Sequence, residues 1–246
     1  MTNGMLLTLS EKEIKVNFKL IMPMAGNGSR FAEAGYTDPK PMIDVEGKPM
    51  FVRAVESIGL EFDDYIFIVR KEHNLVDSVH KYYPNAKVVE IEQLTEGAAC
   101  TVLLADPYLN DEDAVLVSNC DQLIEWDSKL FTQQMDNDGV IMVFDCPERD
   151  PKWSFARIES DTVVEVAEKN PISTHATTGH YYWSHWVTFK NSANRMIQNN
   201  ERTNGEFYLC PVYNETIRAG GKVTISNIDK MHGLGTPEDL ELWLNS

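Results

Sequence analysis

Short blocks rich in apolar residues recur along the first half of the chain, and the segments between them carry apolar residues at helical spacing. Such short blocks are typical of strands that are buried on both faces of a parallel sheet. The strands are expected at 18–24, 65–69, 86–91 and 114–117, and the helices at 49–58, 71–83 and 97–109. This succession of strand and helix predicts a mostly parallel sheet with right-handed crossovers.

The pattern changes in the second half, where the apolar blocks become shorter. The strands are expected at 140–144, 155–158, 163–166, 178–182 and 222–228, and the helices at 127–136, 187–200, 208–219 and from Thr236 onward. The tryptophans beside the short strands, Trp153, Trp183 and Trp186, are expected to pack in the core. Together the two halves predict an α/β protein: a Rossmann-like, three-layer α/β/α fold whose mostly parallel mixed sheet gains extra antiparallel strands in the C-terminal half.

No repeat, low-complexity tract or linker interrupts this pattern. We therefore predict one continuous domain over residues 17–246, preceded by an N-terminal extension over residues 1–16. A chain of 246 residues, 43% of them hydrophobic, is long enough to bury a substantial core without disulfides.

The charge of the chain limits its partners. Twenty-two basic residues against 38 acidic ones give a formal net charge of −16. DNA, RNA and anionic membranes are bound through neutralised phosphates, so this field argues against all three as partners. It does not exclude a small phosphorylated substrate in a local basic pocket.

The cysteines and the apolar runs predict a cytoplasmic protein. Cys100, Cys120, Cys146 and Cys210 lack metal-binding spacing and are expected to be reduced thiols. No signal-peptide core is expected near the N-terminus, and no apolar run reaches the roughly 18 residues that a membrane span needs. The sequence allows a homo-oligomer without indicating one.

The first strand ends in a glycine-rich bend, Ala25-Gly-Asn-Gly-Ser-Arg-Phe31, and Lys40 follows soon after it. Glycines let an anion approach the backbone N–H groups, and cations such as Arg30 and Lys40 complete a phosphate site. The P-loop pattern is absent, and the dinucleotide fingerprint would need a third glycine where Phe31 stands. The bend therefore predicts a phosphate site of another kind, with an ordinary turn as the alternative.

A second polar segment, Ser118-Asn-Cys-Asp121, follows the strand at 114–117. Ligands of open α/β sheets collect at the carboxyl ends of parallel strands, and both this segment and the glycine-rich bend occupy such ends. Asp121 could instead cap the following segment. The two segments together predict a site at one edge of the sheet.

Eight short segments, taken in chain order, resemble motifs of the nucleotidyltransferase family that makes nucleotide-activated sugars and polyols, the sugar-phosphate pyrophosphorylases. Residues 25–31 resemble its G-x-G-[ST]-R-[LF] signature, and 39–41 its P-K-P. The other matching segments are 93–98 (Q…G-x-A), 118–121 (a metal-binding aspartate), 168–171 (E-K-P with one insertion), 178–181 (T-G-x-Y), 205–208 (G-E-[YF]) and 235–238 (G-T-P-E).

The resemblance implies a reaction between two anions. A sugar or polyol phosphate attacks the α-phosphorus of a nucleoside triphosphate in line, and pyrophosphate leaves, so the protein must align the anions and neutralise moving charge. It also implies a nucleotide-binding half over residues 17–125 and an acceptor-binding half over 126–246. Capsule or lipopolysaccharide synthesis is the expected use.

The resemblance further implies a role for each matching residue. Arg30 would bind the β- and γ-phosphates, Lys40 the α-phosphate, Asp121 a Mg²⁺ ion, and Lys169 the acceptor phosphate. The nucleotide would be bound by Ala25, Gly26, Asn27, Gly28, Ser29, Gln93 and Gly97, the last two facing the base, and the acceptor by Glu168, Gly179 and Glu206. The alternatives are solvated side chains for the cations, a surface ion pair for Glu168 and Lys169, and a helix-start role for Glu206.

One position departs from the family pattern. Many members have a second metal-binding aspartate two residues before the glycine of G-T-P, where this chain has Gly233. Either Asp121 holds Mg²⁺ with substrate oxygens and water, or a neighbour such as Asp229 substitutes, or metal-dependent turnover is weak.

Two other functions stay open on the sequence. A glycosyltransferase of the related fold would need a D-x-D motif, where this chain has Asn119-Cys-Asp121. A catalytically silent sugar-nucleotide sensor would bind nucleotide and release no pyrophosphate. Within the sugar-phosphate pyrophosphorylase family, the Ala-Gly-x-Gly-Ser-Arg-Phe form of the bend resembles the cytidylyltransferase branch slightly more than the other branches, which favours CTP.

Overall fold

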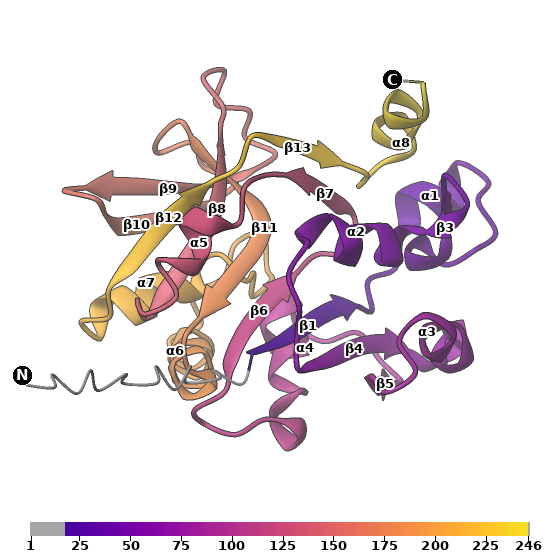
Figure 1. Ribbon diagram of the computed structural model, residues 1–246, viewed down its shortest axis with the longest axis horizontal. Helices are drawn as coiled ribbons and strands as arrows, with labels where there is room; N and C mark the ends of the chain where they lie inside the picture. The colour runs from indigo at the N-terminus through magenta and orange to yellow at the C-terminus, as the bar shows by residue number, and fades with distance from the viewer. Residues whose placement is uncertain (1–17, 246) are drawn as a thin grey trace, which may run out of the picture.

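The computed structural model describes residues 18–245, and the predicted extension over residues 1–16 lies outside them. Within this range the main sheet has nine strands, in the order β10-β9-β11-β6-β1-β4-β5, with β8 pairing to β11 and β12 to β8 (Figure 1). The strands are β1 (Phe18–Met24), β4 (Asp64–Arg70), β5 (Lys87–Ile91), β6 (Ala114–Ser118), β8 (Gly139–Asp145), β9 (Ser154–Glu159), β10 (Thr162–Glu168), β11 (His175–Trp183) and β12 (Val223–Asn227).

The two halves of the sheet pair differently, as the sequence predicts. Strands β5, β4, β1 and β6 are all parallel. From β11 onward antiparallel pairs enter: β11 with β6, β8 and β9, and β9 with β10, whereas β12 is parallel to β8. The chain thus has a three-layer α/β fold with a mixed sheet.

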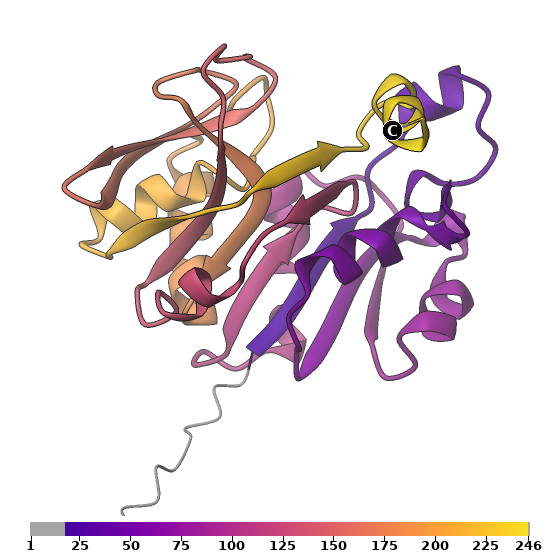
Figure 2. The same cartoon turned by 45° about the horizontal axis from the view of Figure 1, so that its top comes forward.

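Helices cover both faces of this sheet, and α2 and α4 lie on opposite sides of β1 (Figure 2). One face packs against α2 (Met50–Ile58), α3 (Val76–Tyr82) and α5 (Lys129–Thr132). Helix α8 (Pro237–Leu244) contacts β13 and adds Leu240 to the same core cluster. The other packs against α4 (Ala98–Leu103), α6 (Trp186–Gln198) and α7 (Val212–Arg218). None of the helices in the described part of the chain is long and apolar enough to span a bilayer.

The alternation along β1 explains why its apolar run is continuous. Leu20 and Met22 face the core on the α2 side, and Ile21 between them faces the core on the α4 side. All three are fully buried. Each contributes roughly 1.5–3 kcal/mol of burial, so a strand covered on both faces has no tolerance for a polar position in its centre.

Several predicted helices are shorter than their apolar spacing suggests. The segment 97–109 is α4 followed by the 3₁₀ turn η3 (Asp106–Tyr108), because Pro107 cannot donate an N–H within a helix. The segment 71–83 begins with the 3₁₀ turn η2 (Lys71–His73), and Asn74, with φ of 51°, separates it from α3. The helices expected at 127–136 and 208–219 are reduced to α5 and α7.

Two tryptophans of the predicted aromatic set, Trp183 and Trp186, are fully buried, and Trp153 is partly buried against a small apolar cluster. The expectation of core packing is therefore confirmed. All four cysteines are free thiols, as expected.

A two-stranded antiparallel sheet that the apolar pattern does not predict joins distant parts of the chain. Strand β7 (Gln122–Glu125) pairs antiparallel with β13 (Lys230–Gly233), which leads directly into α8. The Thr236 hydroxyl caps α8 by accepting a hydrogen bond from the Asp239 N–H at 3.2 Å, as its position predicts. Through this pair the C-terminal segment returns to the end of β6.

Three short elements complete the edge where β1 ends. They are α1 (Ser29–Glu33), the 3₁₀ turn η1 (Lys40–Met42), and a small two-stranded sheet of β2 (Asp44–Val45) and β3 (Lys48–Pro49). All follow β1 directly, so they place the glycine-rich bend and Lys40 beside the carboxyl end of that strand.

Candidate active site

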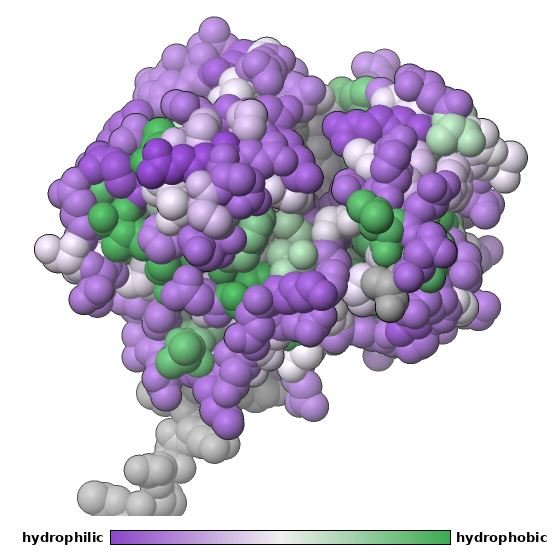
Figure 3. Space-filling view, turned by 90° about the horizontal axis from the view of Figure 1, so that it is seen from above, coloured by the Kyte–Doolittle hydropathy of each residue, from purple (hydrophilic) through white to green (hydrophobic). Residues whose placement is uncertain are grey.

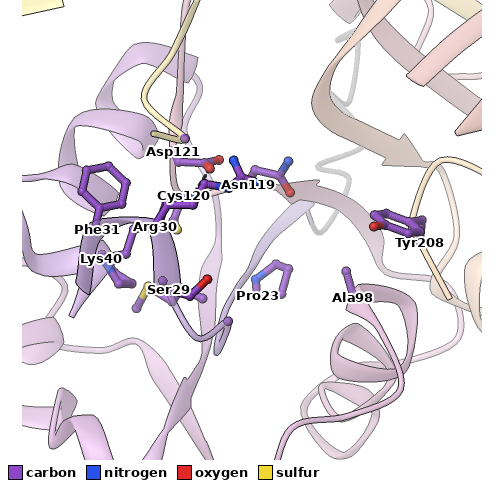
Figure 4. A pocket seen from close by; sticks show the side chains of 15 residues that line it. Pro23, Ser29, Arg30, Phe31, Lys40, Ala98, Asn119, Cys120, Asp121 and Tyr208 are labelled. Carbon is purple, nitrogen blue, oxygen red and sulfur yellow. Dashed lines mark hydrogen bonds and ion pairs between the residues drawn. The ribbon is translucent and has the colours of Figure 1, made fainter. Parts of the chain in front are cut away.

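A cavity of about 420 Å³ lies at the carboxyl ends of β1 and β6. After β1 the chain crosses first to β4 and later back to β6 on the other side, so the cavity lies where the strand order reverses. Such switch points are the usual ligand sites of open α/β sheets. Among the residues that line it are the predicted Gly26, Gly28, Ser29, Arg30, Lys40 and Asp121 (Figure 4).

The bend after β1 needs a glycine at position 28 for two reasons. Gly28 has φ of 60°, and a Cβ there would lie 3.1 Å from the Lys40 Cβ. A Cβ at Gly26 would meet no protein atom within 4 Å, so that position is open toward the cavity. Asn27 is oriented by Arg70 at the end of β4, whose Nη1 donates to the Asn27 Oδ1 at 2.9 Å.

Lys40 and Asp121 form an ion pair within the cavity wall, and each side chain is only about a fifth exposed. Burial opposes the charge on Lys40, but the Asp121 carboxylate outweighs it and raises the pKa of the ammonium group. Burial also raises the pKa of the neighbouring Cys120 thiol to about 12, so this thiol is neutral near pH 7. The pair therefore presents one fixed cation and one fixed anion to whatever fills the cavity.

Asp121 is held in place by the returning C-terminal segment. The Leu234 N–H donates to the Asp121 carbonyl oxygen at 2.7 Å. A Cβ on Gly235 would lie 3.3 Å from the Asp121 Oδ2, and Gly233 pairs with Gln122 next to Asp121. Position 233 is thus one residue away from Asp121 in the β7–β13 pairing, a Cβ there would lie 3.4 Å from the Trp153 Cη2, and glycine supplies no carboxylate.

Asp229 does not replace the missing carboxylate. It precedes β13, and its N–H donates to the Glu125 carbonyl oxygen at 2.9 Å, at the opposite end of the β7–β13 pair from Gly233 and Asp121. Strand residues advance roughly 3.3 Å each, so the length of β13 separates the two carboxylates. The suggestion that Asp229 substitutes at this site is therefore wrong.

The residues around Asp121 fit Mg²⁺ only as part of a substrate complex. Among the described residues there is no group of three or more His, Cys, Asp or Glu side chains that could hold a metal ion. Mg²⁺ is commonly bound by one or two carboxylates together with substrate phosphates and water, and a single carboxylate beside a cationic cavity suits that mode.

A second cavity, of about 630 Å³, adjoins the first and shares Pro23, Gly26 and Ala98 with it. Its lining includes the predicted Ala25, Asn27, Gly97 and Glu206. Seen from above, the molecular surface is mostly hydrophilic, and a furrow divides it into two masses (Figure 3). The two cavities together form one elongated groove, and the cations Arg30 and Lys40 lie at the end formed by the smaller cavity.

Gly97 permits a close approach between the halves of the chain. Its φ is 143°, and a Cβ there would lie 2.4 Å from the carbonyl oxygen of Phe207. Gln93, by contrast, is exposed and is not among the residues that line either cavity. Its predicted contact with a base therefore stays a prediction.

The residues predicted to bind the acceptor lie at the far side of the groove. The Lys169 Nζ donates to the Tyr208 hydroxyl at 2.9 Å, and Tyr208 lines the smaller cavity opposite Asp121 (Figure 4). Glu168 is half-buried and accepts a hydrogen bond from the Ser154 hydroxyl. Glu206 lines the larger cavity and not the smaller one, and its predicted contact with the acceptor stays a prediction.

Gly179 supports the wall of the site from behind. It occupies an irregularity in β11 with φ of 78°, and its carbonyl oxygen accepts the Asn119 N–H at 3.1 Å. A Cβ there would lie 1.9 Å from the Gln122 Oε1 and 2.4 Å from the Asn119 Nδ2. Close packing against the segment that carries Asp121 thus requires a glycine at position 179. His180 beside it is buried, which lowers its pKa to about 4 and keeps it neutral.

The sequence motifs assign no role to two residues of the groove. Tyr208 ends the matching segment 205–208, but it lies before α7, which starts at Val212 and not at the predicted 208, and Arg202 belongs to no recognised motif. An arginine two residues before an Asn-Gly turn, followed by aromatic residues, was the available signal. It is too common to identify a site.

Glu168 gives a prediction for pH dependence. Burial raises the pKa of Glu168, and the hydrogen bond from Ser154 opposes that rise by stabilising the carboxylate. Ser154→Ala should therefore raise the pKa further. If the ionised form binds the acceptor, the acid limb of the kcat/KM profile should move to higher pH.

Ser173→Ala is the control, because the Ser173 hydroxyl donates to the Ala156 carbonyl oxygen in the same region and not to a carboxylate. An unshifted acid limb in Ser154→Ala would mean that Glu168 does not need to be ionised for acceptor binding.

The fold and the groove define the class of the protein, and sequence comparison agrees. The family model described as "Nucleotidyl transferase" matches residues 19–222. The chain therefore belongs to the nucleotidyl transferase family.

Curated relatives are longer than this chain. It is 27% identical over 174 residues to the bifunctional protein GlmU of Methanocaldococcus jannaschii, covering 65% of this chain and 38% of that protein. It is 26% identical over 222 residues to the GlmU of Methanococcus aeolicus, covering 88% of this chain and 51% of the relative. The chain thus spans about half or less of the length of these relatives.

Solved structures resemble it over nearly its whole length. A nucleoside-diphosphate-sugar pyrophosphorylase from Vibrio cholerae RC9 is 28% identical, with a TM-score of 0.82, and the match covers 92% of this chain and 100% of that one. An inositol-1-phosphate CTP transferase from T. maritima is 17% identical, with a TM-score of 0.74 and coverage of 93% and 95%. The second likeness shows the fold alone.

Proposed function

We propose that this protein joins a nucleoside triphosphate and a sugar or polyol phosphate to give a nucleotide-diphosphate sugar or polyol and pyrophosphate. The observation that carries the proposal is the groove itself. Its smaller cavity is lined by Arg30, Lys40 and Asp121 beside the glycine-rich bend, and its larger cavity adjoins the same bend. On the opposite wall Lys169 donates a hydrogen bond to Tyr208, which also lines the smaller cavity. A site for two phosphorylated substrates needs cations on both sides of the reacting phosphorus.

In this proposal the first half of the chain, residues 17–125, binds the nucleotide. The backbone N–H groups of the bend would bind the triphosphate, with Arg30 on the β- and γ-phosphates and Lys40 on the α-phosphate. The base would occupy the larger cavity near Gly97. The net charge of −16 makes this local cluster of cations necessary for binding any anion.

The second half, residues 126–246, would bind the acceptor. Lys169 would bind its phosphate, and Glu168 would accept hydrogen bonds from its hydroxyl groups, with Glu206 and Gly179 nearby. The acceptor phosphate is already an anion, so no general base is needed. The protein's task is to hold the attacking oxygen in line with the α-phosphorus and to neutralise the leaving pyrophosphate.

Asp121 would hold Mg²⁺ together with substrate oxygens and water. When bound, Mg²⁺ supplies positive charge that neutralises the phosphoryl oxygens. Lys40 would then be free of its ion pair with Asp121 and available to the α-phosphate, because the carboxylate would face the metal instead.

We further propose CTP as the preferred nucleotide, in keeping with the form of the bend. A cytoplasmic location, in keeping with the free cysteines, and a role in surface-glycan synthesis, in keeping with the family resemblance, complete the proposal. One similar protein, a nucleoside-diphosphate-sugar pyrophosphorylase, supports a nucleotide-transfer reaction without deciding the base.

A pyrophosphate-release screen tests the proposal. CTP, UTP, dTTP, GTP and ATP are each incubated with a panel of sugar and polyol phosphates and Mg²⁺. We expect pyrophosphate from at least one pair, and most readily from a CTP pair. Nucleotide binding without pyrophosphate from any pair would contradict the proposal and favour a silent sensor, while sugar transfer from a ready-made nucleotide sugar would favour a glycosyltransferase.

A further inference from the structure

A loop from the second half of the chain is fastened to the loop that precedes α4. The Phe207 N–H donates to the Glu96 carbonyl oxygen at 2.9 Å, and the Ala99 N–H donates to the Phe207 carbonyl oxygen at 3.0 Å. Gly97 lies between the two bonds, where a Cβ would be 2.4 Å from the Phe207 carbonyl oxygen. Segments 96–99 and 205–208 therefore move together or separate together.

Arg202 closes the outer side of this junction. Its guanidinium donates through Nη1 to the Gly205 carbonyl oxygen at 3.0 Å and through Nε to the Asn200 Oδ1 at 2.7 Å. It also pairs with the Glu96 carboxylate and stacks on the Phe207 ring, with its Cζ 3.9 Å from the ring centroid. A single side chain thus contacts the loop before α4, the Phe207 ring and the turn between Arg202 and Phe207.

The two neighbours of Phe207 belong to different ends of the groove. Glu206 lines the larger cavity, next to Gly97, and Tyr208 lines the smaller cavity and accepts the hydrogen bond from Lys169. Phe207 itself is buried, so its ring anchors the segment to the core. A shift of this segment at the larger cavity must move the partner of Lys169.

We propose that Arg202 is a positioning residue that couples occupancy of the nucleotide cavity to the placement of Lys169 for the acceptor phosphate. The inference rests on the proposed function and adds to it a residue that acts across the groove. If a ligand in the larger cavity favours the fastened arrangement, then that arrangement also favours the acceptor, and the coupling is reciprocal.

The stacking contact and the bond to Gly205 carry more of this effect than the ion pair. Glu96 is 67% exposed, and an ion pair with an exposed carboxylate contributes little. A planar guanidinium that stacks on a ring and donates to a carbonyl cannot be replaced by an ammonium group. Arg202→Lys should therefore reproduce most of the defect of Arg202→Ala, and Glu96→Gln should have a much smaller effect.

Hydrogen exchange tests the coupling without turnover. Exchange at the Phe207 and Ala99 amides is measured in the full chain, with and without each of the five triphosphates of the screen. We expect at least one triphosphate to slow exchange at both amides in the wild type by about tenfold, equivalent to 1.4 kcal/mol, and to do so far less in Arg202→Ala. Equal slowing in both proteins, or none in the wild type, would overturn the inference.

Steady-state kinetics gives the second readout. With an active substrate pair, Arg202→Ala should raise KM for the acceptor phosphate by about tenfold and change kcat much less, although Arg202 lines the larger cavity and not the smaller one. Arg157→Ala is the matched control, because Arg157 pairs with the exposed Glu165 on the β9–β10 hairpin at 3.0 Å. A rise confined to the nucleotide KM would make Arg202 a simple nucleotide contact and contradict the coupling.

The two readouts separate the inference from the proposed function. If the wild type releases no pyrophosphate with any pair, the proposed function fails, and nucleotide-dependent exchange at Phe207 still decides the coupling. If the wild type turns over and Arg202→Ala behaves like Arg157→Ala, the coupling fails and the proposed function stands. Should Arg202→Ala not fold, Arg202→Lys and Glu96→Gln supply the same comparison.

Discussion

Lys40→Ala and Asp121→Ala should each lower kcat by about a hundredfold or more. This is the usual effect of removing one group that stabilises charge in the transition state. Lys40→Ala removes the proposed contact to the α-phosphate, and Asp121→Ala removes the proposed ligand of Mg²⁺. Each substitution also leaves a partly buried charge without its partner, so thermal unfolding must be measured beside kcat.

Lys190→Ala is the control for this experiment. Lys190, in α6, pairs with Asp106 at 2.9 Å, and neither residue is among those that line the groove. Its removal should leave kcat unchanged. If Lys40→Ala and Asp121→Ala turn over at the wild-type rate, the reacting phosphorus is not at this cavity and the proposed site is wrong.

Gly97→Ala should lower kcat/KM by about a hundredfold, because a methyl group there would overlap the Phe207 backbone. The position of the alanine Cβ is fixed by the backbone and cannot rotate away from the Phe207 carbonyl, so the segment that carries Glu206 and Tyr208 must shift outward. The measurement is kcat/KM for both substrates with the best pair from the screen.

The control separates the overlap from the unusual backbone angle. Gly59 also has positive φ, at 64°, and a Cβ there would meet nothing within 4 Å. Gly59→Ala should cost about 1 kcal/mol of stability and leave kcat/KM near the wild-type value. Equal losses of activity in the two variants would attribute the effect to instability rather than to the junction at Phe207.

Much of the fold follows from local pattern. Strands β1, β4 and β6 are buried on both faces, so their apolar runs are continuous and easily identified. Because parallel strands end at one edge of a sheet, the positions of the glycine-rich bend after β1 and of Asp121 after β6 were enough to predict one site at that edge. The cavity lined by both segments confirms that expectation, and the ion pair of Asp121 with Lys40 adds a contact that was not predicted.

The features that could not be predicted depend on contacts between distant segments. Strand β13 has the sequence Lys230-Met-His-Gly233, which carries no strand pattern, and it exists because it pairs with β7. Tyr208 and Arg202 gain their places from the junction at Phe207, which no local pattern encodes. Pro107 was the exception, since a proline within an expected helix already indicates an earlier end.

The pairing of β13 with β7 also affects the order in which the protein acquires its site during synthesis. The first-made half contains the glycine-rich bend, Lys40 and Asp121, yet the N–H that fixes the Asp121 carbonyl comes from Leu234, far along in the second half. Domains begin to fold from the N-terminus while the ribosome is still adding residues. A nascent chain can thus form the parallel strands early, while the support for Asp121 arrives only after Leu234 has been added.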